Sequence, residues 1–335
     1  MTRSSRSAFA LACALALMTL ACTTPGGGGS VQPSGTPAAS ASTAAGSCLE
    51  SPAPDGTPEG WDVSSQRPSV FPQIINPPAS LTCGSTRLMF SFLDDQNVPV
   101  AKPDRSAAVK LFDLGVDPAK AVAEGEATFI WAIEPRVGVY VVDIDLPTAG
   151  RYGVEFTTTP AGGSAETIRM TMDVQPASDV VSVGDKAPAS KTPTLDQVGG
   201  DVAKISTDPT PVPAFYETSI AQAVAAKEPF VVAFATPKFC VTQQCGPTLD
   251  RLKPIAARHP KVTVINVEPY LLEDVDGQLQ PVLTDGNLTP AQATNEWHLP
   301  TEPWVFVVDR DGVVTHSFML IFSDEELDTA MTEVE

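Results

Sequence analysis

The sequence predicts two folded regions of different class, an all-β sandwich followed by an α/β fold. Between residues 83 and 176, short runs of alternating apolar and polar residues recur with turn residues between them, which is the pattern of an antiparallel sandwich. From residue 213 onward, strand and helix patterns follow one another, an order typical of α/β proteins. The chain of 335 residues is long enough for two domains of ordinary size.

The first residues have the features of a bacterial secretion signal. A short positive segment, an apolar run and a small residue lead up to Cys22, and the apolar run is too short for a retained transmembrane helix. Residues 18–22 resemble the bacterial lipobox, with Thr19 at a place where leucine is usual. This resemblance implies that residues 1–21 are a lipoprotein signal peptide and that Cys22 carries the lipid of an extracytoplasmic, membrane-anchored protein.

The segment after the lipobox is predicted to be a tether. Residues 23–47 contain no charged side chain and almost nothing that could be buried, so this segment cannot offset its ordering entropy. We therefore expect residues 22–47, the lipidated cysteine included, to be disordered.

The net charge of −19 bears on the classes of partner. A strongly acidic protein is repelled by phosphate backbones, so nucleic-acid binding is not expected. The acidic residues are scattered along the chain, and we interpret them as solvating groups.

The cysteines predict two disulfides. One of the six leaves with the signal and Cys22 carries the lipid, and an even number in an oxidising compartment favours pairing of the remaining four. Sequence alone permits three pairings. Because Cys48 and Cys83 both precede the main strands of the first region, while Cys240 and Cys245 lie together in the second, we pair them in that way and expect the first bond to be structural.

The first region, residues 48–176, is predicted to be a sandwich without catalytic groups. Residues 146–152 resemble the tyrosine corner of immunoglobulin-like domains, in which the phenol of Tyr152 would bind the backbone just upstream. That resemblance implies an immunoglobulin-like fold. We find no histidine, cysteine or paired-carboxylate cluster that indicates catalysis here, so binding or spacing is the expected role. The candidate strands are residues 87–93, 108–112, 127–132, 139–144, 151–156 and 168–174.

The second region is predicted to begin after a linker and edge segment at residues 177–212 and to occupy residues 213–335. Thr289, with Pro290 after it, and Ser323 are expected to cap helices. The expected helices are residues 218–227, 247–258 and those after the two caps, and the expected strands are residues 230–235, 262–267, 304–308 and 313–320.

Two motifs in this part resemble a known family. Residues 183–188 read Val-Gly-Asp-Lys-Ala-Pro, and residues 303–312 join a proline-led strand to a D-x-D-G turn. Both are similar to the thioredoxin-like group, most closely to its extracytoplasmic membrane-anchored thiol-disulfide oxidoreductases, and the resemblance covers residues 183–335. It implies an α/β thioredoxin-like fold in which Pro303 is cis, follows Glu302 and belongs to the catalytic site.

Cys240 and Cys245 lie between a predicted buried strand and a predicted helix, where this family places its reactive thiol. Their spacing is C-x4-C, whereas the family motif is C-x-x-C. Five residues along a regular helix place two side chains about 140° apart, so the pair can bond only if Cys240 precedes the helix. Either cysteine could attack. The resemblance implies thiol-disulfide exchange with protein or small-molecule thiols and disulfides, with no cofactor and no metal.

Other functions remain open at this point. The main alternative is a non-enzymatic envelope binding or scaffold lipoprotein in which the second disulfide only stabilises. Thr242 and Cys245 resemble the T-x-x-C of peroxiredoxins, but Pro237 is one residue out of place for such a peroxidase. A Sco-like copper protein would need a histidine three residues from His298, which we interpret instead as a helix-end or surface residue. The two other histidines, His259 and His316, are interpreted as surface residues.

Overall fold

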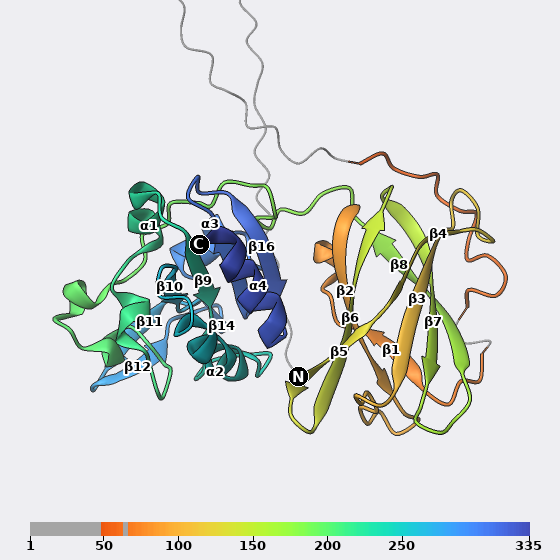
Figure 1. Ribbon diagram of the computed structural model, residues 1–335, viewed down its shortest axis with the longest axis horizontal. Coiled ribbons are helices and arrows are strands. Elements are labelled where there is room, and N and C mark those ends of the chain that lie inside the picture. Colours follow the sequence, from red (N-terminus) through yellow and green to blue (C-terminus); the bar gives the residue numbers. More distant parts are fainter. Residues whose placement is uncertain (1–47, 63–65) are drawn as a thin grey trace, which may run out of the picture. The chain divides into compact units, whose positions relative to one another are not determined.

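The computed structural model describes residues 48–62 and 66–335 (Figure 1). The predictions of a signal peptide, of a lipid on Cys22 and of a disordered tether lie outside these residues. Within the described part, no helix has the length and apolar character needed to cross a membrane.

The first part of the described chain consists of two four-stranded antiparallel sheets. Their inner faces share one core, in which Phe90 packs against Tyr140 of its own sheet and against Phe156 of the other, with ring centroids 5.6 and 4.9 Å apart. The arrangement is that of a β-sandwich. One sheet has the order β1 (Phe71–Ile74), β2 (Gly84–Leu93), β6 (Val137–Leu146) and β5 (Thr128–Ile133), and the other the order β4 (Ala121–Glu126), β3 (Ser106–Asp113), β7 (Gly150–Thr159) and β8 (Glu166–Val174) (Figure 1).

The hydrogen bond expected of Tyr152 is present. Its hydroxyl donates to the carbonyl oxygen of Thr148 at 3.0 Å and lies 2.8 Å from the hydroxyl of the same threonine. The Thr148 hydroxyl in turn donates to a carboxylate oxygen of Asp113 at 2.7 Å. The start of β7 is therefore tied to the end of β3 by a buried polar chain.

A disulfide joins Cys48 to Cys83 across 35 residues of sequence. The amide of Cys83 donates to the carbonyl of Gln175 at 3.1 Å, and the amide of Cys48 donates to that of Pro176 at 3.4 Å. Both cysteines therefore lie beside the segment that follows β8.

Short 3-10 helices and extended segments connect the sandwich to the second part of the chain. The short helices are η3 (Leu195–Val198), η4 (Val202–Lys204) and η5 (Pro213–Tyr216), and a fourth, η2 (Pro78–Ser80), precedes β2. The division of the chain into residues 48–176, 177–212 and 213–335 stays a prediction.

The second part is built around a mixed four-stranded sheet with the order β10 (Thr263–Val267), β9 (Phe230–Phe234), β15 (Trp304–Val308) and β16 (Val314–Met319). β9 and β10 are parallel, whereas β15 is antiparallel to β9 and to β16. All residues of β9 and β15 are buried. One face packs against α2 (Cys245–Ala256) and α4 (Asp324–Val334), and the other against α1 (Ile220–Ala226) and the end of α3 (Gln292–Glu296).

The long polar segment between β10 and α3 forms two small hairpins where a loop is expected. They are β11 (Leu272–Val275) with β12 (Gln278–Pro281) and β13 (Leu283–Thr284) with β14 (Asn287–Leu288). The prediction that Thr289 caps a helix is wrong, because Pro290 pairs with Tyr270 in a β-bridge and the helix begins two residues later, after Ala291.

The predicted fold class is also wrong. The chain is mostly β-sheet, with 37% strand and 17% helix, and the four α-helices have only 5 to 12 residues. The physical reason is local: backbone pairing in the hairpins takes up a segment expected to be irregular, and the helix before β15 is little more than one turn. The structure is predominantly β, and an α/β thioredoxin-like fold is not supported.

Candidate functional site

Cys240 and Cys245 occupy the turn between β9 and α2. Cys240 lies in the loop, and Cys245 is the first residue of the helix. This is the placement that a C-x4-C pair needs in order to bond, and the two cysteines form a disulfide. Pro247 lies in the first turn of α2, where a missing amide hydrogen is tolerated.

The two sulfurs differ in exposure. Cys245 is fully buried and packs with Leu249 in the core under α2, whereas Cys240 is half-buried. The amide of Cys245 donates to the Cys240 sulfur at 3.2 Å, and the Thr242 hydroxyl lies 3.4 Å from that sulfur. Val241, with 70% of its surface exposed, stands beside them. A molecule in solution would therefore reach Cys240 first.

Glu302 holds the cysteine loop from the opposite side. Its side chain is 2% exposed, and it precedes the cis peptide bond to Pro303. One carboxylate oxygen accepts from the amide of Val241 at 2.6 Å, and the other accepts from the hydroxyl of Tyr270 at 2.6 Å. The Glu302 carbonyl accepts from the Thr242 hydroxyl at 2.8 Å. The loop is thus tied to the start of β15 by hydrogen bonds at two consecutive residues.

The carboxylate of Glu302 has hydrogen-bond donors but no cationic partner. Within residues 48–62 and 66–335, no lysine, arginine or histidine forms an ion pair with it. Burial of the phenol and its hydrogen bond to Glu302 raise the pKa of Tyr270. Tyr270 therefore keeps its proton and remains a donor to Glu302.

Cys240, Cys245 and Glu302 form the one group of at least three potential metal-ligating residues found among the described residues. One ligand atom from each residue lies within 4.8 Å of the others. In the disulfide form the sulfurs are bonded to each other. After reduction, the same space would hold two thiols and a carboxylate, which are ligands for thiophilic cations.

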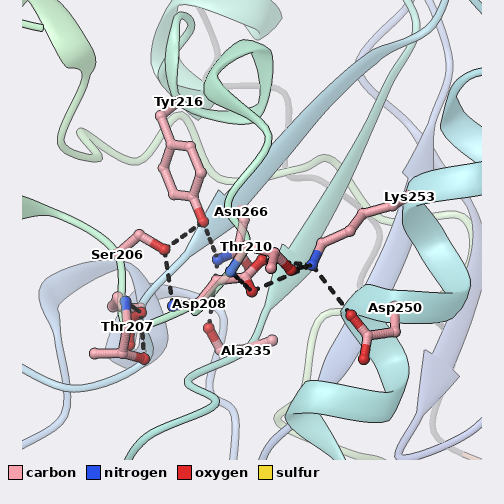
Figure 2. Close-up of polar contacts among 10 residues, drawn as sticks. Ser206, Thr207, Asp208, Thr210, Tyr216, Ala235, Asp250, Lys253 and Asn266 are labelled. Carbon is pink, nitrogen blue, oxygen red and sulfur yellow. Dashed lines mark hydrogen bonds and ion pairs between the residues drawn. The ribbon is translucent and has the colours of Figure 1, made fainter. Parts of the chain in front are cut away.

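A second polar cluster lies on the same part of the fold and is shown in Figure 2. Lys253 of α2 forms an ion pair with Asp208 at 2.8 Å and also reaches Thr210 and Asp250 at 3.0 and 3.1 Å. Burial lowers the pKa of Lys253, but the hydrogen bonds to the two aspartates outweigh that effect and raise it. The cluster is internally paired, and it pins the segment before η5 to α2.

The hydroxyl of Tyr216 is the inner end of this network (Figure 2). It lies 2.7 Å from the Ser206 hydroxyl and accepts from the Asn266 side-chain amide at 2.9 Å. Burial raises the pKa of Tyr216 to about 12. These contacts are structural, because every one of them joins two parts of the protein core.

Glu268 follows β10 at the same edge of the sheet as the cysteine loop. One oxygen accepts from the amide of Thr207 at 2.6 Å and from its hydroxyl at 2.8 Å, and the other has no hydrogen-bond partner in the described structure. Burial raises the pKa of Glu268 to about 7. Glu268 is thus a carboxylate that takes up a proton near neutral pH.

Of the three predicted catalytic residues, the structure bonds Cys240 to Cys245 and places Pro303 directly after Glu302, which contacts the cysteine loop, but their catalytic role stays a prediction. Cys48 and Cys83 form a disulfide of their own, far in the sequence from Cys240 and Cys245. Cys22 lies outside the described residues.

His259 and the peroxiredoxin-like threonine have other surroundings than the sequence indicates, whereas His298 is exposed just after α3, as expected of a helix-end or surface residue. His259 is buried, which corrects its interpretation as a surface residue: its ring nitrogens face Glu335 and Asp328 at 3.1 and 3.2 Å. His298 does not join the group formed by the cysteines and Glu302. Thr242 contacts Cys240, whereas the T-x-x-C pattern would pair this threonine with Cys245.

Sequence reasoning missed one group at this site, Tyr270, and one carboxylate outside it, Glu268. It named Glu302 only as the residue before a cis proline, and it did not identify Tyr270 or Glu268. A glutamate directly before the proline of a buried strand is a weak signal, since the sequence shows neither its burial nor its donors.

Comparisons with known proteins do not identify a family. No protein-family model matches the chain, and no curated protein matches it.

Several solved structures resemble a third of the chain. A DUF4426 family protein from Pseudomonas aeruginosa PAO1 has 13% identity and a TM-score of 0.24 over 33% of this chain and 96% of its own. The PmoD soluble domain from Methylocystis sp. ATCC 49242 (Rockwell) has 15% identity and a TM-score of 0.20, covering 31% and 90%. The Lin-41 filamin domain has 14% identity and a TM-score of 0.19, covering 32% and 93%. Scores at this level carry no functional argument.

The expected membership in the thioredoxin-like oxidoreductases is corrected accordingly. The structure is mainly β, with 37% strand and 17% helix, and does not support a thioredoxin-like assignment. The disulfides exist, but a disulfide at the start of a helix does not establish that family.

Proposed function

We propose that this chain is a lipid-anchored, extracytoplasmic protein that binds or scaffolds other components of the cell envelope without catalysing a reaction. In this proposal Cys22 carries the lipid, the membrane is reached through that lipid, and both disulfides stabilise the fold. The lipobox-like sequence and two cysteine pairs, which suit an oxidising compartment, support it.

The surroundings of Cys240 and Cys245 support a structural role for the second disulfide. Cys245 is fully buried, and the loop of Cys240 is held by hydrogen bonds from Val241 and Thr242 to Glu302. In thiol-disulfide exchange, one sulfur of the bond must form a mixed disulfide with a partner while the other sulfur leaves as a thiol. Here the surrounding contacts instead hold the bonded geometry.

The second candidate function is thiol-disulfide exchange through Cys240 and Cys245. It is favoured by the partial exposure of Cys240 and by the amide of Cys245, which donates to the Cys240 sulfur. Such a donor at a helix N-terminus stabilises a thiolate. Its partners would be protein or small-molecule thiols and disulfides.

A trapping experiment in cells separates the two functions. The Cys245→Ala variant leaves Cys240 able to attack but unable to release a partner, so an exchanging protein would accumulate as a mixed disulfide. We expect no such adduct on a non-reducing gel, and the same result for the matched Cys240→Ala variant. A mixed disulfide that depends on Cys240 would replace the structural role by exchange.

Lipid labelling tests the anchor. In cells fed a palmitate analogue, we expect the wild-type chain to become labelled and to sediment with membranes, and Cys22→Ala to lose both properties. Cys13→Ala is the matched control, since it removes the other leader cysteine and should leave the label unchanged. An unlabelled wild-type chain would contradict the anchor.

A further inference from the structure

Opening the Cys240–Cys245 bond would place two ionisable thiols beside the carboxylate of Glu302. The ligand atoms of both cysteines and of Glu302 lie within 4.8 Å of one another. Like charges at such distances oppose ionisation strongly. Since no cationic side chain of the described residues pairs with Glu302, two thiolates beside it would need either protons or a bound cation.

We propose that the reduced Cys240 and Cys245, together with Glu302, bind one divalent cation of the zinc class. This inference goes beyond the proposed scaffold function, because it concerns the chain with this bond open. Two thiolates and one carboxylate are a ligand set that zinc accepts, whereas Mg²⁺ and Ca²⁺ prefer oxygen ligands alone. Three protein ligands would leave the fourth position of a tetrahedral site to water, and Cys240 is the partly exposed member of the three.

The geometry needs only a small movement. Zinc binds sulfur at about 2.3 Å and carboxylate oxygen at about 2.0–2.2 Å, which places two sulfur ligands roughly 3.8 Å apart. Cys245 is fixed in the first turn of α2, whereas Cys240 precedes the helix, so rotation of the Cys240 side chain would supply this separation while the bonds of Val241 and Thr242 to Glu302 hold the backbone of the loop. The donors Val241 and Tyr270 hold the carboxylate of Glu302 in position, as hydrogen bonds around metal ligands commonly do.

The disulfide form and the metal-bound form are alternative states of the same three residues. A dithiol reductant gives two electrons and two protons to the Cys240–Cys245 bond, which becomes two thiols while the dithiol becomes a disulfide. The cation then replaces the two thiol protons and binds two thiolates. A small-molecule disulfide can reverse this: it takes two electrons from the two thiolates and two protons from solvent and becomes two thiols, while the Cys240–Cys245 bond reforms and the cation is released.

A titration of the full chain with Zn²⁺ tests the proposal. The protein is reduced with a phosphine, freed of reductant without air, and titrated against a chromophoric zinc chelator. We expect one high-affinity Zn²⁺ per reduced chain, none for the oxidised chain, and none for Cys240→Ser/Cys245→Ser, which keeps the other cysteines. Glu302→Gln should weaken binding by about tenfold or more, and Glu268→Gln, a nearby carboxylate outside the site, should leave it unchanged.

A second measurement does not depend on a variant that folds. In the reduced wild-type chain, Zn²⁺ should protect Cys240 and Cys245 from alkylation and leave Cys48 and Cys83 reactive, as read by peptide mass spectrometry. Equal zinc binding by the double serine variant, or equal alkylation of the four cysteines with and without Zn²⁺, would overturn the site. Unchanged affinity in a folded Glu302→Gln variant would remove the carboxylate from it. None of these outcomes bears on lipid labelling or on mixed-disulfide trapping.

Discussion

The two disulfides of this protein do different physical work. Cys48–Cys83 closes 35 residues and Cys240–Cys245 closes five. In the chain-entropy description, loops of these lengths correspond to about 4 and about 2 kcal/mol of stabilisation. The first bond has the larger effect on the unfolded chain, and the second mainly fixes one turn.

Their surroundings differ in the same sense. In the sandwich, the buried carboxylate of Asp113 is satisfied by the Thr148 hydroxyl at 2.7 Å and the Gly115 amide at 3.0 Å. Near the second bond, Glu302 lacks a cation and one oxygen of Glu268 lacks any partner in the described structure. Asp113 and Glu302 are both buried, and each accepts from two donors without an ion pair among the described residues. What sets the cysteine loop apart is therefore the placing of a buried carboxylate within 4.8 Å of the two sulfurs.

Opening the long loop should have the largest effect. We expect Cys48→Ser/Cys83→Ser to lower the free energy of unfolding by about 4 kcal/mol, because the unfolded chain regains the freedom of 35 residues. Chemical denaturation followed by circular dichroism measures this change. A loss below about 1 kcal/mol would remove the proposed difference between the bonds.

The buried carboxylate near the cysteine loop should make stability depend on pH. Burial raises the folded-state pKa of Glu268 to about 7, so the folded protein binds a proton that the unfolded chain has already released. Stability from this group therefore falls as the pH rises from about 4.5 to about 7, by up to about 3 kcal/mol.

The control for this pH effect is Glu268→Gln, which cannot titrate. We expect the stability of the variant relative to the wild type to rise with pH across that window, as measured by urea unfolding at several pH values. Parallel curves for the two proteins would show that Glu268 has an ordinary pKa.

Removing the short disulfide should have a smaller effect than removing the long one. For Cys240→Ser/Cys245→Ser we expect a loss of about 2 kcal/mol in the same denaturation experiment, since only five residues are closed. A loss equal to that of the long loop would mean that the second bond supports more than its turn.

Two tyrosine hydroxyls, one in each region, should have effects no larger than that of the short disulfide. Tyr152→Phe removes a bond to the neutral carbonyl of Thr148 and should destabilise by about 1 kcal/mol. Tyr270→Phe removes a bond to the carboxylate of Glu302 and should destabilise by about 2 kcal/mol, because hydrogen bonds to charged groups are stronger. The reverse order would contradict the stronger hydrogen bond assigned to Tyr270 and Glu302.

Local structure was largely predictable from the sequence. The six strands expected in the sandwich all coincide with observed strands, because each is an apolar-rich run bounded by turn residues, alternating in some strands and continuously buried over several residues in β2 and β6. β1 and β4 were missed: Pro72 indicates a break, and the residues of β4 are mostly alanine and glutamate. Both are edge strands, where such residues are tolerated.

The global class and the site were less predictable. The hairpins β11–β12 and β13–β14 depend on backbone pairing in a polar segment with no hydrophobic pattern, and they shift the balance from helix to strand. The contact of Cys240 with Glu302 joins residues 62 positions apart, and no local pattern encodes such a distance. What the sequence does indicate is that the two cysteines lie between a buried strand and a helix, as observed.

The reduction potential of the Cys240–Cys245 bond tests the central claim most directly. It is measured by equilibrating the protein with defined dithiol and disulfide mixtures and counting the alkylated cysteines of this pair by mass spectrometry. The proposed structural role predicts a potential below about −300 mV, which resists reduction by glutathione. A potential in the range of about −120 to −270 mV, where exchanging dithiols lie, would contradict it.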